Sequence, residues 1–148
     1  MRLTQEADYA IRICLTLDSR GEKMGASEIA ETACITPGIA LKVLRKLVNK
    51  KIVRSFKGAQ GGYMLTRDGN SLSILEIIES IEGKIYISKC LEGEHVCTKN
   101  PQKSCCKMHI AFGAINKSLT ENFGRISIGM LNNEEVSSSD IADLINKK

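Results

Sequence analysis

The sequence lacks the long apolar runs and leader segments that direct a chain into or across a membrane. No apolar run approaches the about 20 residues that a membrane-spanning helix needs. The opening residues Met-Arg-Leu-Thr-Gln-Glu-Ala-Asp contain no apolar signal core. We therefore expect a cytoplasmic protein without a membrane partner, in a reducing compartment that disfavours disulfides.

The motifs of common enzyme classes are also missing. The sequence has no nucleotide-binding loop, and no Ser or Cys nucleophile with His and Asp partners at recognisable positions. Its 148 residues can bury a core as one ordinary domain or two small ones. We therefore do not expect an enzyme.

Acidic residues are absent from one long basic stretch. Residues 42–67 contain no Asp or Glu, and their basic residues are Lys42, Arg45, Lys46, Lys50, Lys51, Arg54, Lys57 and Arg67. A solvated helix face would normally alternate acids with bases. A stretch of one sign therefore favours a polyanionic partner.

Helical periodicity predicts three helices in the first third of the chain. The first is capped by Thr4 and ends near Gly21, with apolar positions Ala7, Ala10, Ile11, Cys14 and Leu17. A short second helix starts at residues 25–27 with Ser27 as its cap. Thr36 and Pro37 open the third, whose buried stripe is Ala40, Val43, Leu44 and Leu47. The second and third helices, joined by a tight turn, predict a helix-turn-helix.

A β-hairpin with a glycine-rich tip follows the third helix. Residues 52–56 and 63–66 suit strands, and residues 57–62 contain three glycines that allow close approach to a phosphate. A hairpin after a helix-turn-helix predicts a winged helix over residues 1–72. The residues predicted to contact duplex DNA are Thr36, Gly38, Lys42, Arg45, Lys46, Arg54, Lys57, Gly58, Gln60 and Gly61.

The second half, residues 73–148, is predicted to regulate and dimerise. Ser73 and Glu76 form a capping box for a helix that ends at Gly83. A long amphipathic helix later carries the stripe Met108, Phe112, Ile115, Leu119 and Phe123, which is either core or, as we favour, a self-complementary dimer seam. Residues 132–139 are expected to form a loop, and Ser139 and Asp140 to begin a terminal helix. The fold class is mainly α with a small hairpin.

Residues 90–109, which we call the cysteine segment, contain four of the six cysteines and both histidines. Their polar, turn-forming composition cannot bury a core, but converging thiolates can hold an iron–sulfur cluster, zinc or cuprous copper. Six residues separate Cys90 from Cys97 and seven separate Cys97 from Cys105, a spacing unlike zinc ribbons or bacterial ferredoxins. Thiol redox chemistry and no special role stay open as alternatives, while Cys14 is expected in the core.

Three stretches together resemble a known family: Met1-Arg2-Leu3-Thr4 with Asp8-Tyr9-Ala10, the wing Ser55 to Leu65, and the cysteine segment. They look like the bacterial regulator family of IscR and NsrR, over residues 1 to about 124. The resemblance implies a homodimeric winged-helix transcription factor, usually a repressor, whose DNA affinity is set by an iron–sulfur cluster or another small signal. Leu41 and Lys51 depart from the pattern, because IscR-like members carry glutamate and glycine there.

The resemblance also implies a ligand set. Cys90, Cys97 and Cys106 match the cluster cysteines, with Cys106 preferred to Cys105 because Cys106-Lys107-Met108-His109 matches the Cys-x-x-His ending of IscR-like members. His109 is the favoured fourth ligand; Asp8 is an alternative, since the matching aspartate of NsrR-like relatives reaches the cluster from the partner subunit. Cys105 or a small external ligand is a further alternative. A 2Fe-2S cluster is favoured and a 4Fe-4S cluster is possible. The dimer should prefer a pseudo-palindromic operator.

Two other functions remain open. One is an iron–sulfur carrier or electron-transfer protein whose basic face binds an acidic protein. The other is a regulator of the same fold that senses through thiols or zinc without a cluster. The predicted wing argues against the carrier, because an electron carrier has no use for a helix-turn-helix with a glycine-tipped hairpin.

Overall fold

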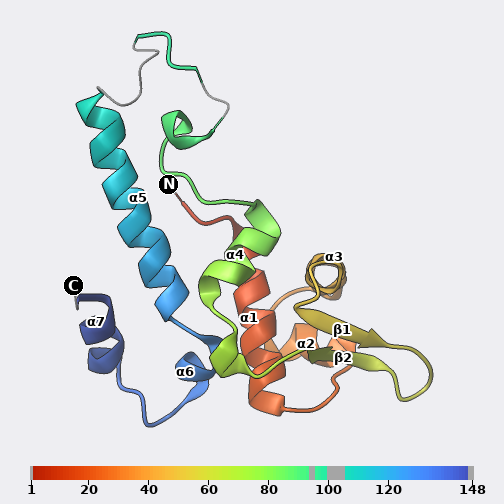
Figure 1. Ribbon diagram of the computed structural model, residues 1–148. Helices are drawn as coiled ribbons and strands as arrows, with labels where there is room; N and C mark the ends of the chain where they lie inside the picture. The colour runs from red at the N-terminus through yellow and green to blue at the C-terminus, as the bar shows by residue number, and fades with distance from the viewer. Residues whose placement is uncertain (1, 94–95, 100–105, 147–148) are drawn as a thin grey trace.

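A computed structural model describes residues 2–93, 96–99 and 106–146. In chain order its elements are α1 (Gln5–Arg20), α2 (Ala26–Thr32), α3 (Pro37–Asn49), β1 (Val53–Phe56), β2 (Gly62–Leu65), η1 (Gly69–Ser71), α4 (Ile74–Glu82), η2 (Lys89–Leu91), α5 (Lys107–Arg125), α6 (Ile128–Asn132) and α7 (Ser138–Asn146). Figure 1 shows α1 to α4 and the hairpin gathered into one body, from which α5 extends away.

The first helix forms as its caps predict. The Thr4 hydroxyl accepts a hydrogen bond from the Ala7 N–H, and Gly21 ends α1 in the left-handed conformation. Ala7, Ala10, Cys14 and Leu17 are buried as expected. Ile13 is buried too, whereas Ile11 is only half-buried, so the apolar face is rotated slightly from the predicted one.

The helix-turn-helix is confirmed, with one correction at its start. The expectation that Ser27 caps α2 is wrong, because the cap is Gly25, two residues earlier, and the helix begins at Ala26. The turn places Cys34 in the left-handed region, with φ 55°. Thr36 then caps α3, and all four predicted stripe residues are buried: Ala40, Val43, Leu44 and Leu47.

The wing is a two-stranded antiparallel hairpin in which Val53 pairs with Leu65. A short extended segment flanks it, since the backbone N–H groups of Met24 and Tyr63 each donate to the other's carbonyl, at 3.0 and 2.8 Å. Gly62 is required at that point: its φ is 149°, and a Cβ would lie 2.7 Å from the Met24 carbonyl oxygen. The segment before α2 thereby supports the wing.

The second half of the chain completes the core of the first. Leu72, Ile77 and Ile128 are fully buried in the same cluster as Ile13 and Leu44. The Ile74 N–H donates to the Ile126 carbonyl and the Ile128 N–H to the Leu72 carbonyl, both at 2.9 Å. Each such buried aliphatic side chain stabilises the fold by about 1.5–3 kcal/mol. The division at residues 72 and 73 therefore stays a functional prediction, because both halves share this core.

The C-terminal elements differ in detail from expectation. Helix α6 was not predicted, and its last residue, Asn132, falls where a loop was expected. Helix α7 starts at Ser138, one residue before the predicted start. The Ser137 hydroxyl accepts from the Asp140 N–H, so the cap lies just outside the helix. Among the residues described, no helix is both long and apolar enough to span a bilayer.

Candidate functional site

The outward face of α3 presents the predicted polar residues to solvent. Thr36, Gly38, Lys42 and Arg45 are exposed, and Lys46 is half-buried. The opposite face of α3 is held in the core, so the helix cannot turn these side chains inward. The Thr36 hydroxyl already accepts from the Ile39 N–H at 3.5 Å, which leaves its own O–H available as a donor.

The wing extends the same surface. Ile52, next to β1, donates its N–H to the Leu47 carbonyl of α3 at 3.0 Å, so the hairpin follows directly from the end of α3. Figure 1 shows α3 and the hairpin on one side of the molecule. Arg54, Lys57, Gly58 and Gln60 are exposed there. Gly58 has a φ of 97° and accepts the Gly61 N–H at 2.9 Å, which closes the tip into a compact turn.

Lys23 packs against the wing, a contact that the sequence did not indicate. Its ammonium group lies 5.3 Å from the centroid of the Phe56 ring and donates to the Gln60 carbonyl at 3.2 Å. Lys23 therefore adds a positive charge to the wing from a segment far away in sequence. The only sequence signal was a lone basic residue before α2, which carries no indication of this contact.

Glu6 also makes contacts that the sequence did not indicate, and it places a negative charge beside the lysines of α3. Its Oε1 lies 2.9 Å from Lys46 Nζ and 3.6 Å from Lys42 Nζ. The Lys46 ammonium group, helped by Lys42, holds the pKa of Glu6 below its ordinary value despite partial burial. The basic stretch contains no acid of its own, but α1 supplies one across the helix pair.

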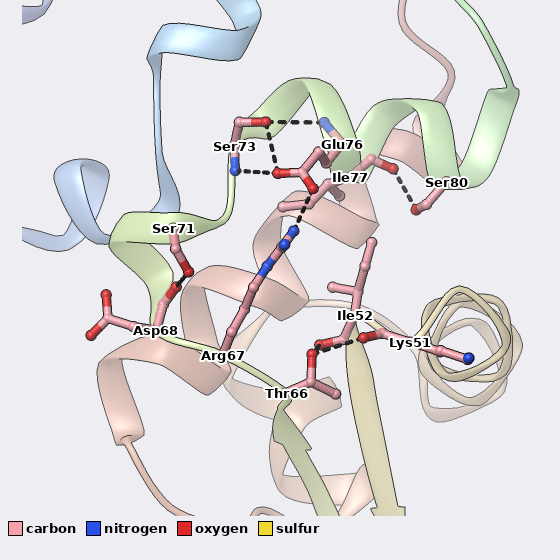
Figure 2. Close-up of polar contacts among 10 residues, drawn as sticks. All are labelled: Lys51, Ile52, Thr66, Arg67, Asp68, Ser71, Ser73, Glu76, Ile77 and Ser80. Atoms are coloured by element: carbon pink, nitrogen blue, oxygen red, sulfur yellow. Dashed lines mark hydrogen bonds and ion pairs between the residues drawn. The ribbon is translucent and has the colours of Figure 1, made fainter.

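A hydrogen-bonded network joins the base of the wing to α4, as Figure 2 shows. Arg67, just after β2, forms an ion pair with Glu76. Glu76 also accepts hydrogen bonds from the Ser73 N–H and hydroxyl, both at 3.2 Å. Burial raises the pKa of Glu76, but the bonds from Arg67 and Ser73 outweigh it and leave that pKa lowered.

The same view shows how the connection between α3 and β1 is held. The Thr66 hydroxyl lies 2.7 Å from the Lys51 carbonyl and 3.1 Å from the Ile52 carbonyl, within donating distance of both. Lys51 has a φ of 60°, in the left-handed region. Glycine would adopt this conformation without steric cost.

The described parts of the cysteine segment are residues 90–93 and 96–99, which follow α4 in the chain, and residues 106–109 at the start of α5. Cys90 lies in η2, half-buried, with its Sγ 3.3 Å from the Ser88 Oγ. Cys97 and Cys106 are half-buried as well. The backbone of Cys106 caps α5, but its side chain makes no capping hydrogen bond, so the thiol is not used by the helix end. Cys105 lies outside the described residues.

His109 lies in the first turn of α5, three residues after Cys106. Its Nδ1 is buried and has no hydrogen-bond partner within the described part of the chain. Such an orphaned nitrogen, three residues after a cysteine in sequence, fits a metal ligand, because neutral imidazole coordinates iron and zinc. The chemistry of the donors therefore fits a thiolate-bound centre.

The ligand set is not drawn together in the structure. Over residues 2–93, 96–99 and 106–146, no three Cys, His, Asp or Glu side chains lie close enough to hold a metal ion. Asp8 pairs instead with Arg12 one turn later, with 2.8 Å between Oδ2 and Nη2. Cys14 is fully buried as expected, and desolvation raises the pKa of its thiol far above the ordinary value. Cys34 is exposed.

Comparisons with known proteins were made for both sequence and structure. The family model Rrf2, described as an iron-dependent transcriptional regulator, matches residues 3–145. The HTH-type transcriptional regulator IscR of Escherichia coli is 27% identical over 139 residues, covering 92% of this chain and 83% of the relative. Each is named as a transcription regulator, and such regulators are not enzymes.

Two solved structures confirm the fold class, a mainly α protein with a winged helix. CymR, the global cysteine regulator of B. subtilis, superposes with a TM-score of 0.70 at 20% identity, over 89% of this chain and 96% of that one. T. potens IscR superposes with a TM-score of 0.69 at 18% identity, over 94% of this chain and 90% of that one.

Proposed function

This chain belongs to the Rrf2 family of DNA-binding transcriptional regulators, and from that membership we propose that it is a cytoplasmic repressor. It binds a pseudo-palindromic operator as a homodimer, and an iron–sulfur cluster in the cysteine segment controls that binding. The observation that carries the proposal is the single basic surface formed by α3 and the wing, with Lys42, Arg45, Arg54 and Lys57 exposed together.

The DNA contacts divide between the two elements. The exposed side chains of α3, from Thr36 to Arg45, enter the major groove and contact base edges. Arg54, Lys57 and Gln60 at the hairpin contact phosphates, where Gly58 and Gly61 allow the backbone to approach. Lys23 strengthens the wing contact from its place over the Phe56 ring.

The homodimer forms through α5. No residue of this helix in the structure is fully buried, although it is 19 residues long. Met108 and Ile115 of the predicted stripe expose 62% and 55% of their surface. A second copy would cover this stripe by two-fold symmetry and would set two recognition helices about one turn of DNA apart.

The cluster is held by Cys90, Cys97 and Cys106 with His109, and Asp8 is the alternative fourth ligand. When bound, the cluster supplies a centre that oxidants can alter, and its oxidation or loss is the signal. Cys106 is the N-cap residue of α5, and His109 lies in the first turn of that helix, three residues later. Ligation through both residues would fix that turn, while Cys90 would fix the chain that leaves α4. The 2Fe-2S form stays favoured and the 4Fe-4S form possible.

One preparation tests this assignment. The protein is purified without oxygen, and its absorption and Mössbauer spectra are recorded beside its iron, sulfide and zinc content. We expect iron and sulfide with a visible chromophore, lost in Cys90→Ser and kept in the matched control Cys34→Ser, whose thiol is exposed on the helix-turn-helix. A chromophore that survives Cys90→Ser would refute the site.

A thiol or zinc sensor of the same fold is the second candidate. The same side chains suit this candidate as well as they suit an iron–sulfur cluster, because three thiols and an imidazole also bind zinc, and free thiols oxidise reversibly. The same preparation distinguishes the two. Zinc in place of iron would indicate a zinc site, and a metal-free protein whose DNA affinity changes with peroxide would indicate a thiol sensor.

A further inference from the structure

Glu6 is the acidic residue that the tertiary fold places among the recognition-helix lysines. It lies in the first turn of α1, and its side chain is only 25% exposed. Lys46 Nζ is close to its carboxylate at 2.9 Å, and Lys42 Nζ is further away at 3.6 Å. Lys42 is 68% exposed and Lys46 40%, so both ammonium groups remain within reach of solvent and of an approaching polyanion.

We propose that Glu6 is an internal counter-charge that competes with DNA phosphates for Lys42 and Lys46 and so limits affinity for any duplex. The proposal rests on the proposed function, since it assumes that α3 faces DNA. Glu6 would then influence DNA binding through Lys42 and Lys46, although α1 itself does not enter the major groove.

The strength of the pairing suits such competition. Partly exposed ion pairs stabilise a protein by at most about 1 kcal/mol, so a phosphate can displace the carboxylate. Displacement leaves the negative Glu6 close to the phosphate, and that repulsion opposes binding. A lysine that keeps an internal partner neutralises less of a phosphate, so fewer counterions leave the DNA and the dependence on salt is weaker than the number of lysines suggests.

The position of Glu6 is fixed by a second contact. The Thr4 N–H and hydroxyl donate to Glu82 Oε1 at the end of α4, at 2.9 and 2.8 Å. Thr4 also caps α1, so the first turn that carries Glu6 is tied to the element that leads into the cysteine segment. The contact between Thr4 and Glu82 of α4 therefore helps to hold Glu6 in its place beside α3.

The test compares Glu6→Gln with the parent by fluorescence anisotropy, using a labelled duplex of random sequence and a series of KCl concentrations. Glutamine keeps the shape of the side chain and removes the charge. We expect affinity to rise by about three- to tenfold, and the slope of log K against log salt to steepen by about one unit. In a Lys42→Gln, Lys46→Gln background the same change should raise affinity by less than about twofold, because the competing lysines are gone.

Glu134→Gln is the matched control. It removes the same charge from the exposed loop between α6 and α7, and should change affinity by less than about twofold.

If circular dichroism shows that Glu6→Gln does not fold, Glu6→Asp, whose shorter side chain reaches Lys42 less well, should also raise the affinity for DNA. An unchanged or weaker Glu6 variant beside a parent that binds DNA overturns this proposal alone. A parent that binds no duplex overturns the proposed function as well.

Discussion

Lys51 shows how one backbone angle links the sequence to stability. Its φ of 60° costs an L-residue about 1–2 kcal/mol, whereas glycine adopts it freely and loses about 0.5–1 kcal/mol in chain entropy. We therefore expect Lys51→Gly to stabilise the fold by about 0.5–1 kcal/mol in urea unfolding.

The neighbouring Lys50→Gly is the control for this change. It removes the same charge at a residue with φ −86°, where glycine relieves no strain. We expect Lys50→Gly to be neutral or destabilising. If the two variants unfold at the same urea concentration, left-handed strain at Lys51 does not limit stability.

At the scale of elements, the Arg67–Glu76 pair joins the wing to α4 (Figure 2). Because the pKa of Glu76 is lowered on folding, the stabilisation is fully present above its unfolded pKa of about 4.5 and is lost as pH falls through the lower folded value. Both side chains are more than 40% exposed, so the effect is at most roughly 0.5–1 kcal/mol.

The prediction follows from that sign. Glu76→Gln should lower stability slightly at neutral pH, and the difference from the parent should disappear in urea titrations as the pH falls through the lowered pKa of Glu76. Arg67→Gln should lower the free energy of unfolding by the same amount as Glu76→Gln. The double variant should be no less stable than either single variant, because both remove the same ion pair. A parent–variant difference that persists unchanged into acid would contradict this account of the pair.

The elements also show what sequence can and cannot predict. The buried stripe of α3 and the capping box at Ser73 were predicted correctly, because helical spacing and cap chemistry are local signals. Helix α6 was missed because its five residues are too few to show a period. The contacts of Glu6 and Lys23 arise between segments that only the tertiary fold brings together, so no local pattern could reveal them. The metal ligands of the cysteine segment stay a prediction for the same reason.

At the scale of the whole molecule, the stripe on α5, in which Met108 and Ile115 are exposed and Phe112, Leu119 and Phe123 half-buried, predicts a dimer. We expect the parent to be dimeric by sedimentation equilibrium, and Ile115→Glu to weaken association by at least about tenfold, since a charge in an apolar seam must be desolvated. Ile110→Glu is the matched control, because Ile110 is 57% exposed on the same helix but lies about half a turn away from the stripe. Equal effects of the two variants would place the seam elsewhere.

The most direct test of the central claim, DNA binding through α3 and the wing, is the salt dependence of duplex binding by the parent and Lys57→Gln. Each lysine that neutralises a phosphate contributes about 0.9 to the slope of log K against log salt. We predict a steep slope for the parent. Lys57→Gln should lower that slope by about one unit for each protomer bound to DNA, and the control Lys117→Gln on α5 should leave it unchanged. A parent that binds without regard to salt, or equal slopes for Lys57→Gln and Lys117→Gln, would contradict the account.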